Sequence, residues 1–143
     1  MQLIEAWKEL PFEQIVALYA AVGWQLYAKQ PALLKKAFEG SDYVLLALKD
    51  GELLGLSRSV SDDVSIHYLQ DILVHPKAQR KGVGRAIFGA VLQRYEHVRT
   101  HMLLTDDEEK QKLFYTSLGY HNVGLLSKHK LNAFVKMKGV ELS

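Results

Sequence analysis

The chain has 143 residues, of which 48% are hydrophobic and 24% are charged, and it contains no cysteine. This length suits one domain with a sizeable apolar core, which we place over residues 1–143. The lack of cysteine excludes disulfides, thiolate metal sites and a cysteine nucleophile. The net charge of +2 is too small to indicate a broad surface for nucleic acid.

The amino terminus reads MQLIEAWKEL, which contains acidic residues and no long apolar run. It is therefore not typical of a signal peptide. No apolar stretch in the chain approaches the length needed to span a membrane. We expect a cytoplasmic protein without a membrane partner.

The first third of the chain predicts a short strand followed by two helices. Residues 3–7 are compatible with the strand. Pro11 stands where the first turn of a helix tolerates proline, and Gly23 ends that helix. Pro31 and Gly40 bound the second helix in the same way.

Three strands follow the two helices. The apolar runs 43–48 and 53–60 flank Asp50-Gly51, a strong signal for a hairpin. The run 66–74 is rich in apolar and β-branched residues, and Pro76 ends it because proline cannot donate to a central ladder. The three runs together predict a meander.

A basic glycine loop, QRKGVG at residues 79–84, follows the third of these strands and leads into a helix. The first N–H groups of a helix have no partner and carry the positive end of its dipole, so they can hold an anion. Gly82 and Gly84 let phosphate oxygens approach the backbone closely. The cations around the loop are Lys77, Arg80, Lys81 and Arg85. A diphosphate fits this loop, and the spacing excludes both the Walker A and the Rossmann patterns.

The remaining chain predicts a strand over 101–104, a helix that ends at Gly119 and two last strands over 120–126 and 131–137. The strand at 101–104 follows the strand at 66–74 through a helical crossover, so the two should be parallel. The expected element order is β-α-α-β-β-β-α-β-α-β-β.

The loop QRKGVG resembles the Q/R-x-x-G-x-G/A signature of the GNAT superfamily of N-acetyltransferases, and Val74-His75-Pro76 resembles the end of that family's cofactor strand. The resemblance implies the GNAT fold, an α/β domain with a mixed, strongly twisted central sheet flanked by helices. It also implies acetyl-CoA as the acetyl donor. The cofactor-binding residues it implies are Ile72, Leu73, Val74, Gln79, Arg80, Lys81, Gly82, Val83, Gly84 and Arg85.

The segment FYTSLGY at residues 114–120 resembles the family's F-Y-x-x-x-G-F/Y segment, whose tyrosine hydroxyl lies near the cofactor sulfur. The resemblance implies Tyr115 as the general acid that protonates the leaving thiolate. A phenol has an ordinary pKa of about 10, so it can deliver a proton without being ionised at rest. The alternative is a tyrosine that packs beside its apolar neighbours. Glu108 and Gln111 depart from the family pattern, which commonly has asparagine and alanine at these positions.

Asp71 is the only carboxylate of the central strand, and an acid in an apolar strand needs a partner or a purpose. It is a candidate general base for the amine. Two alternatives stay open: a structural acceptor near a strand bulge, or a charge that attracts a cationic acceptor. His67 and His75 are conceivable bases because histidine titrates near neutrality, but the six histidines form no metal-binding pattern.

Trp24 and Tyr27 lie between the two N-terminal helices. The resemblance implies that these helices and their connection form one wall of the acceptor groove, so both aromatic residues are candidate substrate contacts. Gln70 is a further candidate for lining the groove. The alternative is that the aromatic residues fill the core beneath the helices.

The function that the sequence predicts is direct transfer of an acetyl group from acetyl-CoA to a primary amine, on a small molecule or a peptide. A non-catalytic acyl-CoA-binding domain is the first alternative, because the glycine loop specifies binding rather than turnover. A nucleic-acid-binding module is the second, although no extended basic face supports it. The apolar last strands are compatible with a homodimer.

Overall fold

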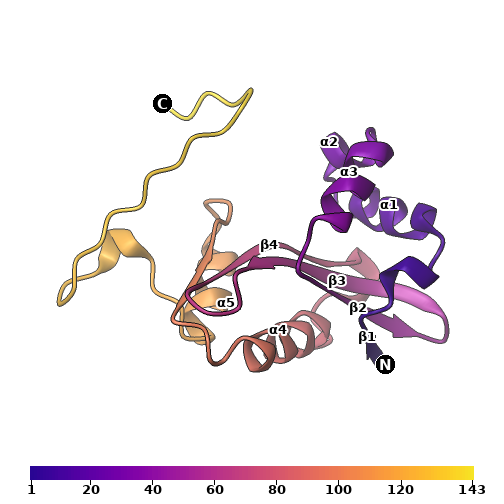
Figure 1. The fold of residues 1–143 in the computed structure, drawn as a ribbon, viewed down its shortest axis with the longest axis horizontal. Helices are drawn as coiled ribbons and strands as arrows, with labels where there is room; N and C mark the ends of the chain where they lie inside the picture. Colours follow the sequence, from indigo (N-terminus) through magenta and orange to yellow (C-terminus); the bar gives the residue numbers. More distant parts are fainter. The chain divides into compact units, whose positions relative to one another are not determined.

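The computed structural model describes residues 1–143 and contains two compact units, Met1–Leu104 and Thr105–Ser143. The first unit contains every strand of the protein (Figure 1). The second contains one α-helix and one short 3₁₀ helix. The single domain expected over residues 1–143 stays a prediction.

The first unit is built on a five-stranded sheet in the order β1-β2-β3-β4-β5. All neighbouring strands are antiparallel except the parallel pair β4 and β5, which α4 (Val83–Arg94) connects. The strands are β1 (Gln2–Ile4), β2 (Tyr43–Lys49), β3 (Glu52–Ser61), β4 (Ile66–Val74) and β5 (Thr100–Leu103). This arrangement confirms the predicted α/β class with a mixed sheet. The first strand is shorter than expected, because η1 (Trp7–Glu9) begins where the prediction continued the strand.

Helices cover both faces of this sheet (Figure 1). α1 (Phe12–Ala21), α2 (Gln25–Ala28) and α3 (Pro31–Glu39) lie on one face, and α4 lies on the other. The helix α2 occupies the connection that the sequence left irregular. No helix of the protein has both the length and the apolar character needed to cross a bilayer.

The main apolar core lies between the sheet and the helices α1 and α3. Its buried members from the helices are Ile15, Leu18, Tyr19, Leu34 and Phe38, and those from the strands are Val44, Leu46, Leu48, Leu53, Leu56 and Leu73. The only polar atom that this set contributes is the hydroxyl of Tyr19. That hydroxyl needs a partner in the interior, because a buried unsatisfied polar group is costly.

A β-bulge at Gln70 interrupts the pairing of β3 with β4. Arg58 pairs with Asp71, but the next residue of β3, Ser59, pairs with Leu69, so Gln70 is an extra residue. One extra residue in a strand shifts the alternation of its side chains between the two faces of the sheet. The two halves of β4 therefore present their buried side chains to opposite helical layers.

Contacts on either side of Gln70 show this change of face. His67, before the bulge, stacks on Tyr95 at the end of α4, with ring centroids 4.1 Å apart. Asp71, after the bulge, accepts a hydrogen bond of 2.8 Å from Tyr19 of α1. The bulge thus turns the only carboxylate of β4 toward the layer formed by α1, α2 and α3.

The second unit contains α5 (Glu109–Ser117) and η3 (Val123–Leu125), and it contains no strand. The two strands predicted over 120–126 and 131–137 are therefore absent from the structure, and that part of the predicted element order is wrong. The homodimer that these runs suggested stays a prediction.

Local hydrogen bonding and the lack of a pairing partner explain these absences. The side chain of Asn122 accepts a hydrogen bond of 3.1 Å from the N–H of Gly124, which closes a turn in the middle of the first run. Such side-chain bonds compete with extended pairing. The second run has apolar residues but no strand beside it, and Phe134 is 93% exposed. An apolar run forms a strand only where another strand satisfies its backbone.

Candidate active site

The end of β4 leads into the glycine loop through a short 3₁₀ helix, η2 (Pro76–Ala78). His75 caps this helix, since its Nδ1 accepts a hydrogen bond of 3.2 Å from the N–H of Lys77. The N–H of His75 donates to the carbonyl of Leu54 at 2.7 Å, which fixes the turn to the neighbouring strand. His75 is therefore a turn residue, which leaves it poorly suited to act as a base.

Two left-handed residues shape the glycine loop. Arg80 has φ 63° and Gly82, the N-cap of α4, has φ 83°. No side chain caps this helix, and its start is rich in cations, so its first N–H groups are left for an anion. Arg80, Lys81 and Gly82 are exposed. Backbone concavities of this kind bind phosphate oxygens.

Gln79 has a different position from the one the motif alone suggests. Its side-chain amide donates to the carbonyl of Val74 at 3.1 Å, which ties the loop to the end of β4. Val83 and Leu73 are buried, with side chains only 5% and 2% exposed. Of these expected cofactor residues, Val83 and Leu73 can therefore offer a ligand only their main-chain groups.

Gly55 of β3 lets α4 pack closely against the sheet. A Cβ at this position would lie 2.7 Å from the carbonyl oxygen of Leu73, 3.1 Å from Ile87 and 3.3 Å from Val83. Contacts shorter than 3.0 Å to a backbone atom cannot be accommodated without a shift of the chain. The first turn of α4 and the glycine loop before it are thus held against β3 and β4 by the absence of this one side chain.

The parallel pairing of β4 with β5 ends early. It begins at Ile66 with Thr100 and stops at Leu69 with Leu103. The remainder of β4, through Val74, pairs with β3 on its other side but has no strand on the β5 side. The expected cofactor residues 72–74 lie on this open edge, where an extended ligand can pair with main-chain groups.

A buried cluster of three side chains lies on the other half of the site. The hydroxyl of Tyr19 and the Nε of Arg58 both donate to Oδ2 of Asp71, at 2.8 and 2.9 Å. The three residues are 0%, 6% and 3% exposed. The guanidinium of Arg58 also donates to Oγ of Ser41 at 3.2 Å and lies 5.8 Å from the ring of Phe38.

The electrostatics of this cluster favour a fixed ion pair. Burial and the neighbouring Asp71 raise the pKa of Tyr19 far above its ordinary value, so the phenol stays protonated. Burial lowers the pKa of Arg58, but its interactions with Asp71 and Tyr19 together outweigh burial, and the pKa is raised. Asp71 therefore accepts hydrogen bonds from two donors that keep their protons, which leaves it poorly placed to act as a base.

The predicted acceptor contacts gather around the same cluster. The rings of Trp24 and Tyr27 both meet Tyr19 edge-on, with centroids 5.8 Å apart in each case. Gln70 is exposed at the bulge, next to Asp71 in the chain. The structure thus joins the two readings of the aromatic residues, since Trp24 is 36% exposed while Tyr27 packs partly against the core.

Arg58 and Tyr19 are site residues that the sequence reasoning missed. A signal for Arg58 was available: it is the only charged residue inside its apolar strand, as Asp71 is in the next strand. Antiparallel neighbours that each carry one charge of opposite sign favour an ion pair. No comparable signal marks Tyr19, whose spacing only predicts a residue of the apolar helix face.

His67 lies in a second buried cluster on the α4 side. Its Nε2 is 2.9 Å from Oγ of Ser59, and its Nδ1 is 3.1 Å from Nδ1 of His101. Burial and the nearby His101 lower the pKa of His67 to about 4. His67 is therefore neutral at pH 7 and enclosed, so it is not available to a substrate. No group of three or more acidic or histidine side chains in the structure could hold a metal ion.

Tyr115 lies in α5 of the second unit and is partly buried. Its ring meets Phe114 at 5.3 Å and Tyr120 at 6.3 Å, both edge-on. Burial raises the pKa of Tyr115 above its ordinary value, and it raises that of Tyr120 to about 12. A phenol that holds its proton in this way is a donor at pH 7.

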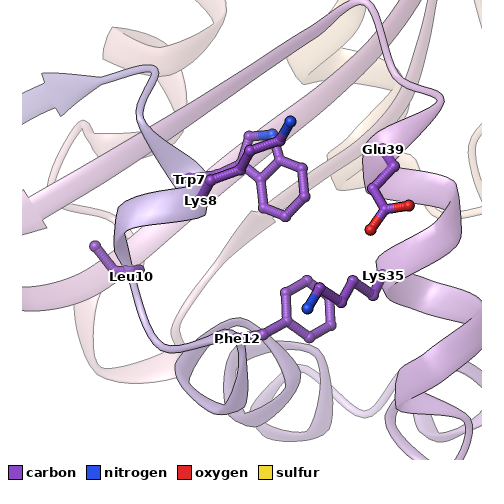
Figure 2. A pocket seen from close by; sticks show the side chains of 6 residues that line it. All are labelled: Trp7, Lys8, Leu10, Phe12, Lys35 and Glu39. Atoms are coloured by element: carbon purple, nitrogen blue, oxygen red, sulfur yellow. The ribbon is translucent and has the colours of Figure 1, made fainter.

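A surface pocket of about 370 Å³ lies apart from all the residues predicted for the site. Figure 2 shows side chains from η1, from the start of α1 and from α3 around it. They are Trp7, Lys8, Leu10, Phe12, Lys35 and Glu39. None of the polar groups among them is buried, and the pocket adds nothing to the loop or to the Tyr19 cluster.

Comparisons with known proteins agree with this geometry. A sequence model described as an acetyltransferase (GNAT) domain matches residues 15–140. A protein of Gibberella zeae named as an acetyltransferase is 31% identical over 130 residues, which cover 89% of this chain and 66% of that protein. An N-acetyltransferase named from Gracilaria tenuistipitata is 27% identical, over 70% of this chain and 56% of its own length. This chain thus spans less than two thirds of either curated relative.

Solved structures share the fold. A GNAT-family acetyltransferase from Streptococcus pneumoniae TIGR4 has a TM-score of 0.75 and 27% identity, and the match covers 95% of this chain and 97% of that one. An aminoglycoside 6'-N-acetyltransferase in complex with coenzyme A has a TM-score of 0.67 and 15% identity, over 83% of this chain and 73% of that one. On the extent of the domain match and of these relatives, the chain belongs to the GNAT acetyltransferase family.

Proposed function

We propose that this protein transfers an acetyl group directly from acetyl-CoA to a primary amine, on a small molecule or a peptide. The observation that carries the proposal is that a strand edge open to an extended ligand is followed in the chain by a helix start suited to an anion. The open edge of β4, residues 72–74, leads through η2 and the glycine loop to the uncapped, cationic start of α4. A ligand with an extended arm and a diphosphate matches both features in that order.

Each expected cofactor residue then has a distinct task. Arg80, Lys81 and Arg85 supply positive charge, and the main chain of residues 82–85 offers N–H groups to the diphosphate. The main chain of residues 72–74 pairs with the pantetheine arm and offers an N–H to the oxyanion. Gln79 acts through its hydrogen bond to Val74 by holding the loop in place.

The reaction needs no covalent intermediate on the protein. The neutral amine attacks the thioester carbonyl, so that a C–N bond forms and the carbonyl oxygen takes up the negative charge. The attacking nitrogen passes its extra proton to water, and the tetrahedral intermediate expels the thiolate as the C–S bond breaks. We propose that Tyr115 gives the thiolate its proton, because burial keeps that phenol protonated at pH 7.

The acceptor lies on the aromatic side in this proposal. Trp24 and Tyr27 provide apolar faces, and Gln70, exposed at the bulge next to Asp71 in the chain, provides an amide. Such a surface favours a small amine with an apolar body, or a peptide amine next to an apolar residue. Arg58 already pairs with the carboxylate of Asp71, the only acid of β4. This strand therefore offers no unpaired carboxylate that would attract a polycationic acceptor.

A thermal-shift titration with acetyl-CoA tests the cofactor assignment, since a ligand that binds the native state raises the melting temperature. Gly82→Ala is the informative variant, because a Cβ there meets nothing within 4 Å but φ is 83°. Gly51→Ala is the matched control, as it also has positive φ and open space but lies in the β2–β3 hairpin. We expect both variants to lose about 1 kcal/mol of stability, and only Gly82→Ala to lose most of the acetyl-CoA shift.

Two further arms separate the alternatives. A short DNA duplex at matched phosphate concentration should give no shift, and a shift with DNA alone would replace the proposal with nucleic-acid binding. Tyr115→Phe should bind acetyl-CoA as the native protein does while losing thiol release in a screen of primary amines. Binding of acetyl-CoA without any turnover by the native protein would leave the non-catalytic acyl-CoA-binding domain.

A further inference from the structure

The Tyr19–Asp71–Arg58 cluster joins the central strand to the aromatic residues of α2. We infer that Asp71 is a positioning residue: its carboxylate holds the Tyr19 ring, and that ring holds Trp24 and Tyr27 in place to receive the acceptor. The inference rests on the proposed function in one respect, that Trp24 and Tyr27 line the acceptor side. It assigns to Asp71 a task other than taking a proton.

The charges of the cluster argue against proton transfer to Asp71. Both donors converge on the same oxygen, Oδ2, at 2.8 and 2.9 Å, and the carboxylate is 3% exposed. A proton placed on Asp71 would leave the guanidinium of Arg58 buried without a counter-charge. Leaving one partner of a buried ion pair uncompensated is strongly destabilising. Asp71 is therefore held by two donors in the interior, as suits a positioning residue.

The geometry of α2 explains why it needs an external support. This helix has four residues, no buried residue and no side-chain cap. A single turn of helix is not stable by itself, because nucleation costs more than its few hydrogen bonds return. The N–H of Trp24 donates to the carbonyl of Tyr19 at 3.0 Å, and the rings of Trp24 and Tyr27 rest edge-on against the Tyr19 ring. Tyr19 is thus the common support of both aromatic side chains.

The orientation of the Tyr19 ring depends in turn on Asp71. Tyr19 is fully buried, and its hydroxyl donates a hydrogen bond of 2.8 Å to Asp71. The bulge at Gln70 places Asp71 on this face of the sheet, and Arg58 fixes the carboxylate from the neighbouring strand. The chain of contacts runs from β3 and β4 through Asp71 and the Tyr19 ring to the exposed face of Trp24.

Trp24 itself reports on this chain of contacts. The protein has two tryptophans, so Trp7→Phe leaves Trp24 as the only one. In that background, Asp71→Asn and Tyr19→Phe should raise the Stern–Volmer constant for acrylamide quenching by about twofold, measured well below melting, because the aromatic wall loosens locally. Tyr43→Phe is the matched control, since its ring lies edge-on to Tyr95, 5.8 Å away, and away from α2. Unchanged quenching in both test variants would overturn the inference.

Kinetics with the primary amine that the native protein acetylates fastest give a second readout. If Asp71 only positions Trp24 and Tyr27, Asp71→Asn should raise KM for that amine by about tenfold and leave kcat and the pH profile unchanged. A fall in kcat of about a hundredfold with loss of the ascending limb of the pH profile would identify Asp71 as the base and overturn the inference. Should the native protein acetylate no amine, the proposed function fails, whereas the fluorescence result still decides the positioning role.

Discussion

The two halves of β4 support two buried polar clusters that differ in charge. Toward α4, the imidazole of His67 is neutral at pH 7 and contacts Ser59 and His101. Toward α1, Asp71 is an ionised group compensated by Arg58. His67 and Asp71, four positions apart in one strand, thus anchor two different clusters, one built on a neutral imidazole and one that depends on an ion pair. The difference teaches that burial alone does not decide how a polar group contributes, because its partner does.

Removal of Arg58 should have the largest effect. Arg58→Ala leaves Asp71 buried without its counter-ion, and breaking one side of a buried pair costs about 3–5 kcal/mol. Urea unfolding at pH 7 measures this loss. Arg94→Ala is the matched control, because the Arg94–Asp63 pair is exposed and such pairs contribute about 0–1 kcal/mol. Equal losses in the two variants would show that the Arg58 pair behaves as a surface pair.

Lowering the pH should give the second-largest effect, because it acts on the buried imidazole of His67. The pKa of His67 is about 4 in the folded protein, whereas an unfolded histidine titrates near 6.5. As the pH falls from about 6.5 to about 4, only the unfolded chain takes up this proton, so its contribution to stability is present above that window and lost within it. The loss approaches about 3 kcal/mol, at 1.36 kcal/mol per unit of pKa.

Urea unfolding at pH 7 and pH 5 tests this dependence in the native protein and two variants. His67→Gln should flatten the dependence between these pH values. His129→Gln, at an exposed position of the second unit, should leave it as it is. A native-like slope in His67→Gln would show that other groups take up the proton.

The close packing of α4 predicts an intermediate effect. In Gly55→Ala the new Cβ meets the carbonyl of Leu73, so the chain must shift, at a cost of about 1–3 kcal/mol. In Gly89→Ala, within α4 itself, the new Cβ meets nothing within 4 Å, so this variant should stabilise the protein by about 0.5–1 kcal/mol. Opposite signs in thermal melts would support the packing argument. We also expect Gly55→Ala to weaken acetyl-CoA binding, because the new Cβ displaces Leu73, which precedes the glycine loop, and Val83, which lies within it.

The glycine loop was predictable because its signals are contiguous in the chain. Proline, two glycines and four cations lie within residues 76–85, and the helix and strand on either side follow from periodicity. The structure places the start of α4 at Val83, directly after Gly82. Local chemistry was enough here.

The Tyr19 cluster was not predictable in the same way. Tyr19 and Asp71 are separated by 52 positions in the chain, and their contact depends on the bulge at Gln70. The sequence raised a bulge only as one alternative for Asp71, without its position or the partner of the carboxylate. Simple alternation would have put Asp71 on the same face as His67. The prediction of two strands over 120–126 and 131–137 was wrong for a related reason. Apolar composition favours a strand, but it does not show whether a second strand is present to pair with it.

We expect the smallest effect at Ser57, whose buried hydroxyl tests whether the partner of a polar group decides its contribution. It is fully buried in β3, directly before Arg58, and its hydroxyl has no hydrogen-bond partner. An unsatisfied buried hydroxyl costs free energy in the folded state, so Ser57→Ala should be neutral or stabilising by up to about 1 kcal/mol. Ser59→Ala, which removes the contact to His67, should instead destabilise by about 1 kcal/mol. The two serines lie two positions apart in one strand, so opposite outcomes in urea unfolding would isolate the partner as the deciding factor. If both variants lose stability equally, the hydroxyl of Ser57 is satisfied in solution, and burial without a partner is not what distinguishes it.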